Sequence, residues 1–375
     1  MVKLEMIGRR KISDCKLMLK TITTTELKTK LLQNYKIIDV RASQEFAQGA
    51  LPNSVNLPIL NDEERALVGT CYKKLGAEKA IELGNQIVSG PNKNEKIKKW
   101  QEFVNKNPQT IIACFRGGLR SQITQVFLSE LGIEIDRIEK GYKEARSFFS
   151  EELSRYCKTE YVKVLTGNTG SGKTQILKQV GLFYPAVDLE ELAKHKGSAF
   201  GALATPQPAQ ASFENYLSFE IMKLRAVNPK AIILYEDESR LIGKIHLPEV
   251  FFEKLRDAKV IKVKISLEGR IENIFSDYIY PEEAIFQKYT LAIFKIEKKL
   301  GSARCVELKK DLEYSKKQFL EQGLLISNKI WIEKLLVWYY DPMYSYSFNQ
   351  RKPQLEFEGA PEEIIEYLKN KKTKK

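Results

Sequence analysis

The octet Gly167-Asn168-Thr169-Gly170-Ser171-Gly172-Lys173-Thr174 constrains the fold of this chain more than any other segment. It fits the pattern G-x4-G-K-[ST] at every fixed position, and it lies between an apolar run and a segment with helical periodicity. In this setting backbone N–H groups bind phosphates, Lys173 supplies positive charge, and Thr174 is placed to ligate Mg²⁺. The octet therefore predicts an α/β domain with a phosphate or diphosphate site formed by Gly167, Gly170, Gly172, Lys173 and Thr174.

Acidic residues follow two apolar segments downstream of this loop. Glu236, Asp237 and Glu238 come after one segment, and Asp188 lies in the other. A carboxylate at the end of a neighbouring strand commonly holds Mg²⁺ through water in phosphate-loop enzymes. We therefore expect Mg²⁺ at Thr174 and Asp237, with the other three acids as competing ligands or acid/base groups. No residue that would activate water can be identified, so a diphosphate group on a molecule other than ATP is an alternative occupant.

Two further residues have open roles. His195 lies in the turn-like stretch HKGSAFG and is one of only two histidines, so it could act as an acid or base, bind phosphate, or form a hydrogen bond that stabilises the loop. Cys71 could relay a persulfide, although a partly buried position on a helix is the simpler interpretation.

A second constellation surrounds Cys114. An apolar run leads into this cysteine, and the segment Phe115-Arg116-Gly117-Gly118-Leu119-Arg120 then turns into a helix. Loop N–H groups and the positive end of that helix should face the sulfur, favour the thiolate and hold an anion. Cys114, Arg116 and Arg120 therefore form a predicted catalytic site. The spacing Cys-X5-Arg is also that of cysteine-dependent phosphatases, in which the thiolate attacks phosphorus.

Segments upstream of Cys114 resemble the rhodanese pattern, and the match covers roughly residues 15–145. They are the strand DVR at residues 39–41, the pair EF at residues 45–46 and the turn GALPNS at residues 49–54. Rhodanese-type sulfurtransferases usually have a shorter cysteine loop. The longer loop in this chain suits a larger tetrahedral anion, phosphate or selenophosphate. The phosphatase alternative stays open, because some phosphatases share this fold.

The order of the apolar segments indicates the domain layout. Segments rich in β-branched residues alternate with longer amphipathic ones, as in α/β domains with parallel strands. The expected strands cover residues 35–40, 110–114, 134–138, 161–166, 186–189, 231–235, 260–266 and 354–358. We expect a rhodanese-like α/β domain followed by a P-loop NTPase-like α/β domain with a helical C-terminal extension. The expected boundaries are 1–145 for the first domain, 146–159 for a linker helix, 160–280 for the P-loop domain and 281–375 for a helical, basic region.

Composition restricts the compartment and the partners. Lys and Arg number 61 and Asp and Glu 48, so the net charge is +13, which favours a polyanionic partner such as RNA. The five cysteines are Cys15, Cys71, Cys114, Cys157 and Cys305. Their odd number and wide spacing do not fit a disulfide framework. Neither a signal peptide nor a membrane-spanning segment is evident, so we expect a cytoplasmic enzyme without membrane contact.

The combination of these two domains resembles the bacterial tRNA 2-selenouridine synthases. The resemblance extends through about residue 280 and includes polar stretches that core packing does not explain. Those stretches are NDEERALVGTCYK at residues 61–73, CFRGGLRS at 114–121, DLE at 188–190, HKGSAFG at 195–201, QP at 207–208, FEN at 213–215 and EDESRLIG at 236–243.

The resemblance implies both an activity and substrates. Enzymes of this family replace the sulfur of wobble 2-thiouridine in tRNA with selenium from selenophosphate, through an S-geranyl intermediate made from geranyl diphosphate. It implies that Cys114 is the catalytic cysteine and that residues 167–174 bind the diphosphate. The expected partners are tRNA and an enzyme that produces selenophosphate, and no tightly bound organic cofactor is expected. The alternatives are a rhodanese-fold phosphatase fused to a P-loop kinase or NTPase, and a non-catalytic RNA-binding protein.

The C-terminal region offers candidate RNA contacts. The lysine pairs 309–310 and 316–317 and the tail at residues 369–375 could bind phosphates. The aromatic run Trp338-Tyr339-Tyr340 could stack an exposed anticodon base. A core role for these rings is an equal alternative, because apolar residues precede them.

Overall fold

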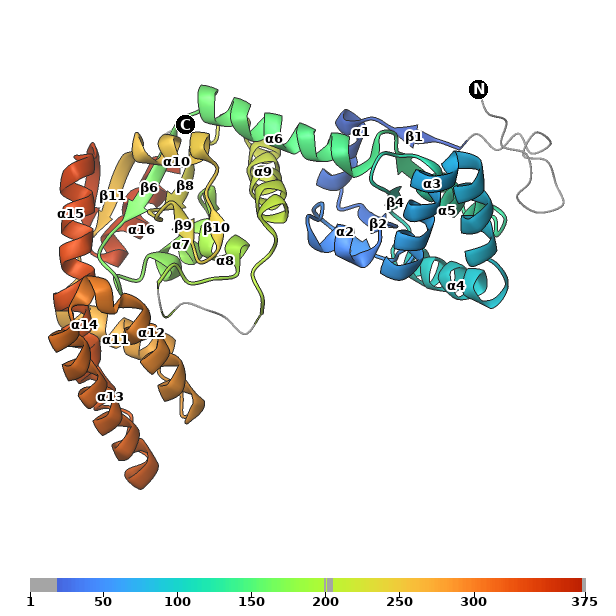
Figure 1. The fold of residues 1–375 in the computed structure, drawn as a ribbon. Coiled ribbons are helices and arrows are strands. Elements are labelled where there is room, and N and C mark those ends of the chain that lie inside the picture. The colour runs from blue at the N-terminus through green and yellow to red at the C-terminus, as the bar shows by residue number, and fades with distance from the viewer. Residues whose placement is uncertain (1–18, 199, 201–204, 373–375) are drawn as a thin grey trace. The chain divides into compact units, whose positions relative to one another are not determined.

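The computed structural model describes residues 19–198, 200 and 205–372 and divides the chain into two compact units (Figure 1). Unit 1 contains the residues up to Glu152 together with Ala209–Phe219, and unit 2 contains Leu153–Pro208 together with the residues from Glu220 onward. Helices α6 (Gly141–Thr159) and α9 (Gln210–Val227) have residues in both units.

Unit 1 is built on a parallel sheet with the strand order β1-β5-β4-β2-β3. Its strands are β1 (Thr21–Ile22), β2 (Lys36–Asp39), β3 (Ser54–Asn56), β4 (Thr110–Ala113) and β5 (Asp136–Ile138). Ile38 of β2 pairs with Ile112 of β4, and both side chains are fully buried. Parallel strands buried on both faces require such apolar runs, and this explains why β2 and β4 were predictable.

Helices surround this sheet and frame the cysteine loop. They are α1 (Thr24–Leu32), α2 (Ser43–Ala47), α3 (Asp62–Ile87), α4 (Gly90–Lys106) and α5 (Leu119–Ser129). Asn61 caps α3 by accepting a hydrogen bond from the Glu64 backbone N–H, and the Glu64 side chain accepts one from the Asn61 N–H in return. Gly76 interrupts α3 with a φ of 85°, a conformation that favours glycine, so α3 is kinked there.

Unit 2 has its own parallel sheet, with the strand order β12-β11-β6-β8-β7. Its strands are β6 (Val162–Thr166), β7 (Ala186–Val187), β8 (Ile233–Glu236), β11 (Lys259–Val263) and β12 (Leu355–Gly359). Helices α7 (Lys173–Gly181), α8 (Leu189–Ala193), α10 (Glu249–Arg256) and α11 (Leu267–Tyr278) connect these strands, together with a short hairpin of β9 (Leu241–Ile242) and β10 (Ile245–His246). The two parallel sheets confirm the expected α/β class.

The expected division at residue 280 needs correction. Strand β12 pairs with β11, and helix α16 (Pro361–Lys372) packs against α7. The terminal strand and helix therefore complete the P-loop sheet. Strand β11 is interior to this sheet, and its backbone N–H and C=O groups pair with β6 on one side and β12 on the other. The helical region is an insertion between β11 and β12, and it includes α12 (Ala284–Leu300), α13 (Ser302–Gln322), α14 (Asn328–Leu335), the π-helical turn η1 (Leu336–Tyr340) and α15 (Asp341–Arg351).

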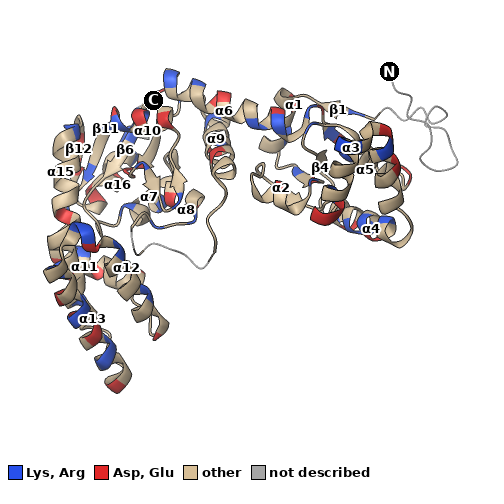
Figure 2. Ribbon diagram, viewed as in Figure 1, with Lys and Arg blue, Asp and Glu red and all other residues tan. Residues whose placement is uncertain are grey.

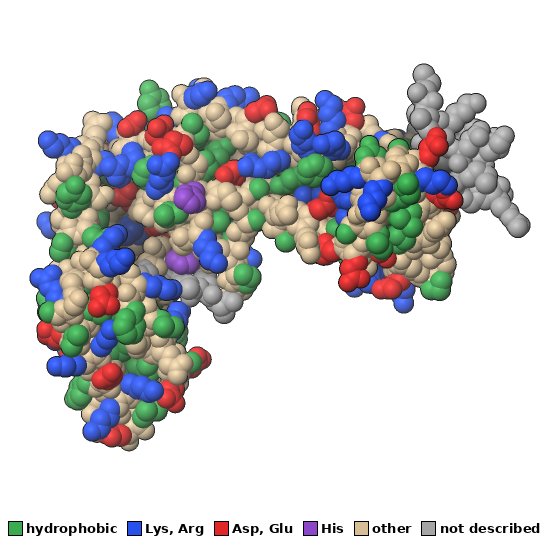
Figure 3. All heavy atoms as spheres, in the orientation of Figure 1, with side chains coloured by type: hydrophobic (Ala, Val, Ile, Leu, Met, Phe, Trp, Pro, Cys, Tyr) green, Lys and Arg blue, Asp and Glu red, His purple; other side chains and the backbone are tan. Residues whose placement is uncertain are grey.

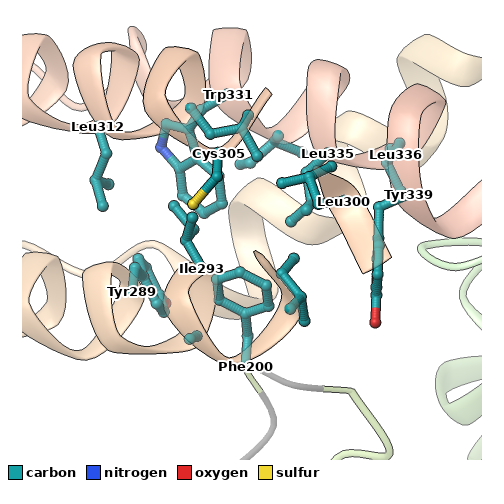
Figure 4. Close-up of a cluster of buried hydrophobic side chains, with 14 of the residues drawn as sticks. Phe200, Tyr289, Ile293, Leu300, Cys305, Leu312, Trp331, Leu335, Leu336 and Tyr339 are labelled. Atoms are coloured by element: carbon teal, nitrogen blue, oxygen red, sulfur yellow. The ribbon is translucent and has the colours of Figure 1, made fainter. Parts of the chain in front are cut away.

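This helical region has an apolar core of its own (Figure 4). Phe200 stacks on Trp331 with ring centroids 5.9 Å apart, and Tyr289 contacts both rings. Tyr339 is only 8% exposed within this core, and Trp338 and Tyr340 pack against it. The base-stacking interpretation of residues 338–340 is therefore wrong for Tyr339, because its side chain is buried and its ring lies edge-on to the Tyr340 ring.

Charges of both signs cover the helical region. Figure 2 shows Lys and Arg alternating with Asp and Glu along α13, and Figure 3 shows the same mixture on the molecular surface. Lys316 pairs with Glu283 and Lys317 with Glu321, whereas Lys309 lies over the Phe294 ring. Residues 373–375 of the basic tail, like Cys15, lie outside the described residues. Within the described part of the chain, no helix combines the length and the apolar character needed to cross a membrane.

Candidate active sites

The Cys114 loop joins the end of β4 to the start of α5. Cys114 follows the last residue of β4 and is 2% exposed. Its sulfur lies 3.1 Å from the Ser121 Oγ, in the first turn of α5, and 3.9 Å from the Gly118 carbonyl oxygen. The sulfur is therefore at the positive end of a helix, where an anion is stabilised.

Backbone contacts from the start of α6 fix the shape of this loop. The Tyr142 N–H donates to the Cys114 carbonyl at 2.8 Å, and the Lys143 N–H donates to the Phe115 carbonyl at 3.0 Å. Gly141 has a φ of 66°, and a Cβ at this position would lie 2.3 Å from the Cys114 carbonyl oxygen. Gly141 therefore belongs to the site. In the sequence it was recognisable only as the glycine at which an expected strand ends.

The two arginines of the loop differ in their surroundings. Arg120 donates to both carboxylate oxygens of Glu45, at 2.5 and 3.3 Å, whereas Arg116 is exposed at the loop surface. Burial would raise the pKa of Glu45, but the hydrogen bond and the charge of Arg120 hold it below its usual value. Arg120 is therefore positioned by an ionised partner, whereas the exposed Arg116 guanidinium lies over the Phe115 ring, 5.9 Å from its centroid.

Arg137 is a member of the site that the sequence reasoning missed. It lies on β5, and its Nη1 donates to the Gly117 carbonyl at 2.5 Å. Burial lowers the pKa of Arg137, and the nearby Cys114 opposes this effect. Its Nε is buried without a partner, so the guanidinium keeps a free donor near the cysteine loop. The only feature of the sequence that could have identified Arg137 is a charged residue within a short expected strand of a parallel sheet.

The predicted phosphate loop has the expected geometry in unit 2. It connects β6 to α7, and Gly170 and Gly172 have φ values of 82° and 78°. A Cβ on Gly170 would lie 2.8 Å from the Arg270 carbonyl oxygen, so only glycine fits at this position. Lys173 Nζ donates to the Gly167 carbonyl at 2.9 Å. The lysine side chain is therefore folded back over the phosphate loop, where it could also bind a phosphate.

Side chains from α11 and α15 anchor the phosphate loop. Arg270 is a nearly buried residue whose Nε donates to the Thr169 carbonyl at 2.8 Å. Its Nη1 and Nη2 donate to the Asp341 carboxylate at 3.0 and 2.6 Å, and Asn168 donates to the same carboxylate at 2.9 Å. Asn273 adds a hydrogen bond to the Gly170 carbonyl at 2.9 Å. The loop is thereby held in place by residues distant in sequence.

A cluster of glutamates faces the phosphate loop. Thr174 Oγ1 donates to Glu190 Oε2 at 3.2 Å, and the Glu190 N–H donates to Glu236 at 3.0 Å. Burial raises the pKa values of Glu190 and Glu236, and burial together with the charge of Glu190 raises the pKa of Glu238 to about 8. One oxygen of Glu236 is buried without a partner. The cluster thus has unused capacity to bind a cation or a proton.

The carboxylate beside Thr174 is Glu190, and not the expected Asp237. Asp237 accepts a hydrogen bond from Arg351 at 2.6 Å and another from Thr166, so its oxygens are occupied. Across the described residues, no three His, Cys, Asp or Glu side chains are grouped closely enough to hold a metal by themselves. Mg²⁺ normally binds through one or two carboxylates together with substrate phosphates and water, so the Thr174 and Glu190 oxygens fit this ion.

Asp188 and His195 lie outside the pocket at the phosphate loop. Asp188 caps α8 by accepting a hydrogen bond from the Glu191 N–H at 2.8 Å. Burial and the charges of Lys288 and Lys295 lower the pKa of His195, and its Nδ1 is buried without a partner. His195 also lies against Gly243, but its Nδ1 does not make the expected hydrogen bond that would stabilise the loop.

A pocket of about 440 Å³ opens at the phosphate loop and continues into the helical region. Its polar end is lined by Lys173, Thr174 and the glutamate cluster. Its other end is apolar, and the side chains there are Phe200, Ile274, Tyr289, Trp331, Leu335 and Leu336. The pocket can therefore bind a molecule with an anionic head and an apolar tail.

Comparisons with known proteins agree with both halves of the chain. Residues 23–147 match the rhodanese-like domain family, and residues 160–375 match the family described as the tRNA 2-selenouridine synthase AAA domain. The chain is 42% identical to the tRNA 2-selenouridine synthase of Nitrosomonas europaea, over 90% of this chain and 95% of that protein. It is 40% identical to the enzyme of the same name from Bdellovibrio bacteriovorus, over 93% of this chain and 98% of that protein.

Proposed function

Because the chain belongs to the tRNA 2-selenouridine synthase family, we propose that it replaces sulfur with selenium in wobble 2-thiouridine of tRNA. The proposal includes selenophosphate as selenium donor and an S-geranyl intermediate made from geranyl diphosphate. It makes the protein a transferase that acts in the cytoplasm, in company with an enzyme that supplies selenophosphate.

The pocket of unit 2 is the observation that carries this proposal. Geranyl diphosphate has a doubly charged head and a ten-carbon apolar chain. The phosphate loop and Lys173 match the head, and the aromatic and aliphatic end of the pocket matches the chain. A nucleotide could stack its base on Trp331, but its ribose would place hydroxyl groups against Leu335 and Leu336. The apolar end therefore favours a prenyl donor over ATP.

In the first step, the sulfur of 2-thiouridine attacks C1 of geranyl diphosphate. The S–C1 bond forms, the C1–O bond breaks, diphosphate leaves, and the N3 proton of the base passes to solvent. Loop N–H groups and Lys173 bind the charge that develops on the leaving diphosphate. Mg²⁺, held by Thr174 and Glu190, would neutralise part of the same charge when bound.

In the second step, the selenium of selenophosphate attacks C2 of the geranylated base. The C2–Se bond forms, the C2–S bond breaks, and geranylthiolate leaves and is protonated by water. Hydrolysis of the Se–P bond then releases phosphate and leaves 2-selenouridine. Cys114 lies at the start of α5 and Arg137 donates to the loop that follows it, so an anionic donor bound there would be stabilised by positive charge and loop N–H groups, with Arg116 of the same loop adding charge.

Mass spectrometry of tRNA nucleosides tests both steps. The full chain is incubated with 2-thiouridine tRNA and geranyl diphosphate, and selenophosphate is then added. Lys173→Ala should abolish formation of S-geranyl-2-thiouridine, and Cys114→Ala should accumulate it without selenation. Wild-type protein that forms neither product would refute the proposal, and rapid p-nitrophenyl phosphate hydrolysis that depends on Cys114 would favour a phosphatase instead.

A further inference from the structure

Unit 1 contains an apolar groove between α3 and α5 that the proposed chemistry has not used. The groove has a volume of about 660 Å³. Its apolar lining includes Val68, Ala80 and Ile81 from α3 and Leu119, Ile123 and Phe127 from α5. We call it the α3–α5 groove. Nearby on α3, Leu67, Tyr72 and Leu75 are each more than 59% exposed, so this face of unit 1 presents more apolar surface than its packing requires.

The α3–α5 groove is continuous with the Cys114 loop. Leu119 and Arg120 are the first two residues of α5, they follow the loop directly, and both line the groove. A ligand in the groove therefore has one end beside the residues that surround the cysteine. This continuity suits a substrate that carries an apolar chain close to its reacting atom.

Positive charge surrounds the apolar lining. Arg65, Lys73 and Arg120 also line the groove, and Arg65 and Arg120 share Glu45 as an ion-pair partner, at 3.6 and 2.5 Å. Figure 3 shows hydrophobic side chains beside Lys and Arg on the surface of unit 1. An apolar groove with a cationic border matches a nucleic acid that bears an apolar substituent, because phosphates bind the border while the substituent leaves water.

We propose that the α3–α5 groove binds the geranyl chain of the S-geranylated wobble uridine during selenium transfer. This inference rests on the proposed function and adds a second prenyl site, distinct from the donor pocket of unit 2. The base would lie at the Cys114 loop with its chain along α3 and α5. After the C2–S bond breaks, the groove would still hold the geranylthiol, so product release requires this chain to leave.

Gly84 offers a direct perturbation of the groove. It lies on α3 and lines the groove, and a Cβ at this position would meet no atom within 4 Å. Gly84→Leu therefore projects an apolar side chain into the groove from a position where the Cβ is unobstructed, and leucine also favours the helical backbone. Glu82→Leu is the matched control, because Glu82 lies on the same helix with a side chain 56% exposed and outside the groove lining.

The experiment compares two tRNA substrates with the full-length chain. One carries S-geranyl-2-thiouridine and the other S-methyl-2-thiouridine, and kcat/KM for selenation is measured at saturating selenophosphate. Wild-type protein should prefer the geranyl substrate by about 100-fold, the factor expected when three to four methylene groups leave water. Gly84→Leu should reduce this preference to less than about tenfold, through a higher KM for the geranyl substrate, whereas Glu82→Leu should retain it.

Other results would overturn the inference. Equal use of the two substrates by wild-type protein would do so, as would a Gly84→Leu variant that loses activity equally on both. A Gly84→Leu variant that changes only the sedimentation of the protein would assign the groove to a second copy or another protein. Failure of the proposed function looks different, because wild-type protein would then form no S-geranyl tRNA and would selenate neither substrate.

Discussion

Asp341→Ala should destabilise unit 2 and loosen its phosphate loop. The substitution removes the carboxylate that accepts hydrogen bonds from Arg270 and Asn168. The Arg270 side chain is only 7% exposed, so its charge would remain buried with the Thr169 carbonyl as its remaining partner. Removing one partner of a buried ion pair costs about 3–5 kcal/mol, and the 28% exposure of Asp341 places the cost near about 3 kcal/mol.

Calorimetry of the full chain measures this effect. For a unit of this size, each kcal/mol lowers the melting temperature by about 2–4 °C, so the transition of unit 2 should fall by about 6–12 °C. Glu272→Ala is the matched control, because Glu272 on α11 pairs with Lys329 and has a side chain 58% exposed. Its exposed pair contributes less than about 1 kcal/mol, and the melting temperature should change by only a few degrees.

Inorganic diphosphate supplies a second measurement. At about 100 times its dissociation constant, a ligand stabilises the native state by about 2.7 kcal/mol. In Asp341→Ala the loop is less well ordered, so the same concentration of diphosphate should raise the melting temperature less. Adding Arg270→Ala should cost less in Asp341→Ala than in the wild-type protein, because it removes the unpaired charge along with the hydrogen bond to Thr169. The reasoning would be refuted if Asp341→Ala and Glu272→Ala melted within about 2 °C of each other.

Three further predictions follow from the two sites. Gly141→Ala should slow alkylation of Cys114 by iodoacetamide and abolish selenation, because the new Cβ would meet the Cys114 carbonyl oxygen at 2.3 Å. Gly132 has a similar φ of 76° with open space around it, so the control variant Gly132→Ala should retain both properties. Glu238 should lose its proton as the pH rises through about 8, so native-state stability should fall between the ordinary glutamate pKa and about pH 8, and without Mg²⁺ the dissociation constant for diphosphate should rise above pH 8. Titration of Glu238→Gln should show neither Glu238-dependent change, and an identical pH profile in the two proteins would contradict this assignment. Shortening the donor to dimethylallyl diphosphate should lower kcat/KM for S-prenylation by at least about tenfold, since five carbons leave the apolar end of the pocket, and equal rates would contradict the assigned orientation.

Local sequence patterns predicted much of the fold. The apolar runs that became β2, β4, β6 and β11 are long enough to identify, and the glycine pattern of residues 167–174 fixed the phosphate loop between β6 and α7. Strands β1, β9 and β10 have only two residues each and were not expected, because so short a segment shows no periodicity. Strand β7 is equally short, and it was expected only because its residues lie in the apolar segment 186–189. The role of β12 depends on pairing with β11 across the whole helical region, which local patterns do not encode.

The site residues show the same division between local and distant information. Cys114 and Lys173 were identifiable because their loops are continuous in sequence. Asp237 is occupied by Arg351, which lies 114 residues away, so the choice of Glu190 beside Thr174 required the structure. The apolar end of the pocket likewise depends on side chains from several helices, and their convergence follows from tertiary packing alone.

The insertion of the helical region between β11 and β12 has a kinetic consequence. Both ends of this region are attached to neighbouring strands of one sheet, and its side chains form the apolar end of the donor pocket. If that end opens to admit a prenyl chain, it remains tethered on both sides, so its effective concentration at the phosphate loop stays high. Closure is then a unimolecular step that can be faster than dissociation of the donor. Cleavage of the chain between the helical region and either β11 or β12 should therefore raise the rate of donor dissociation.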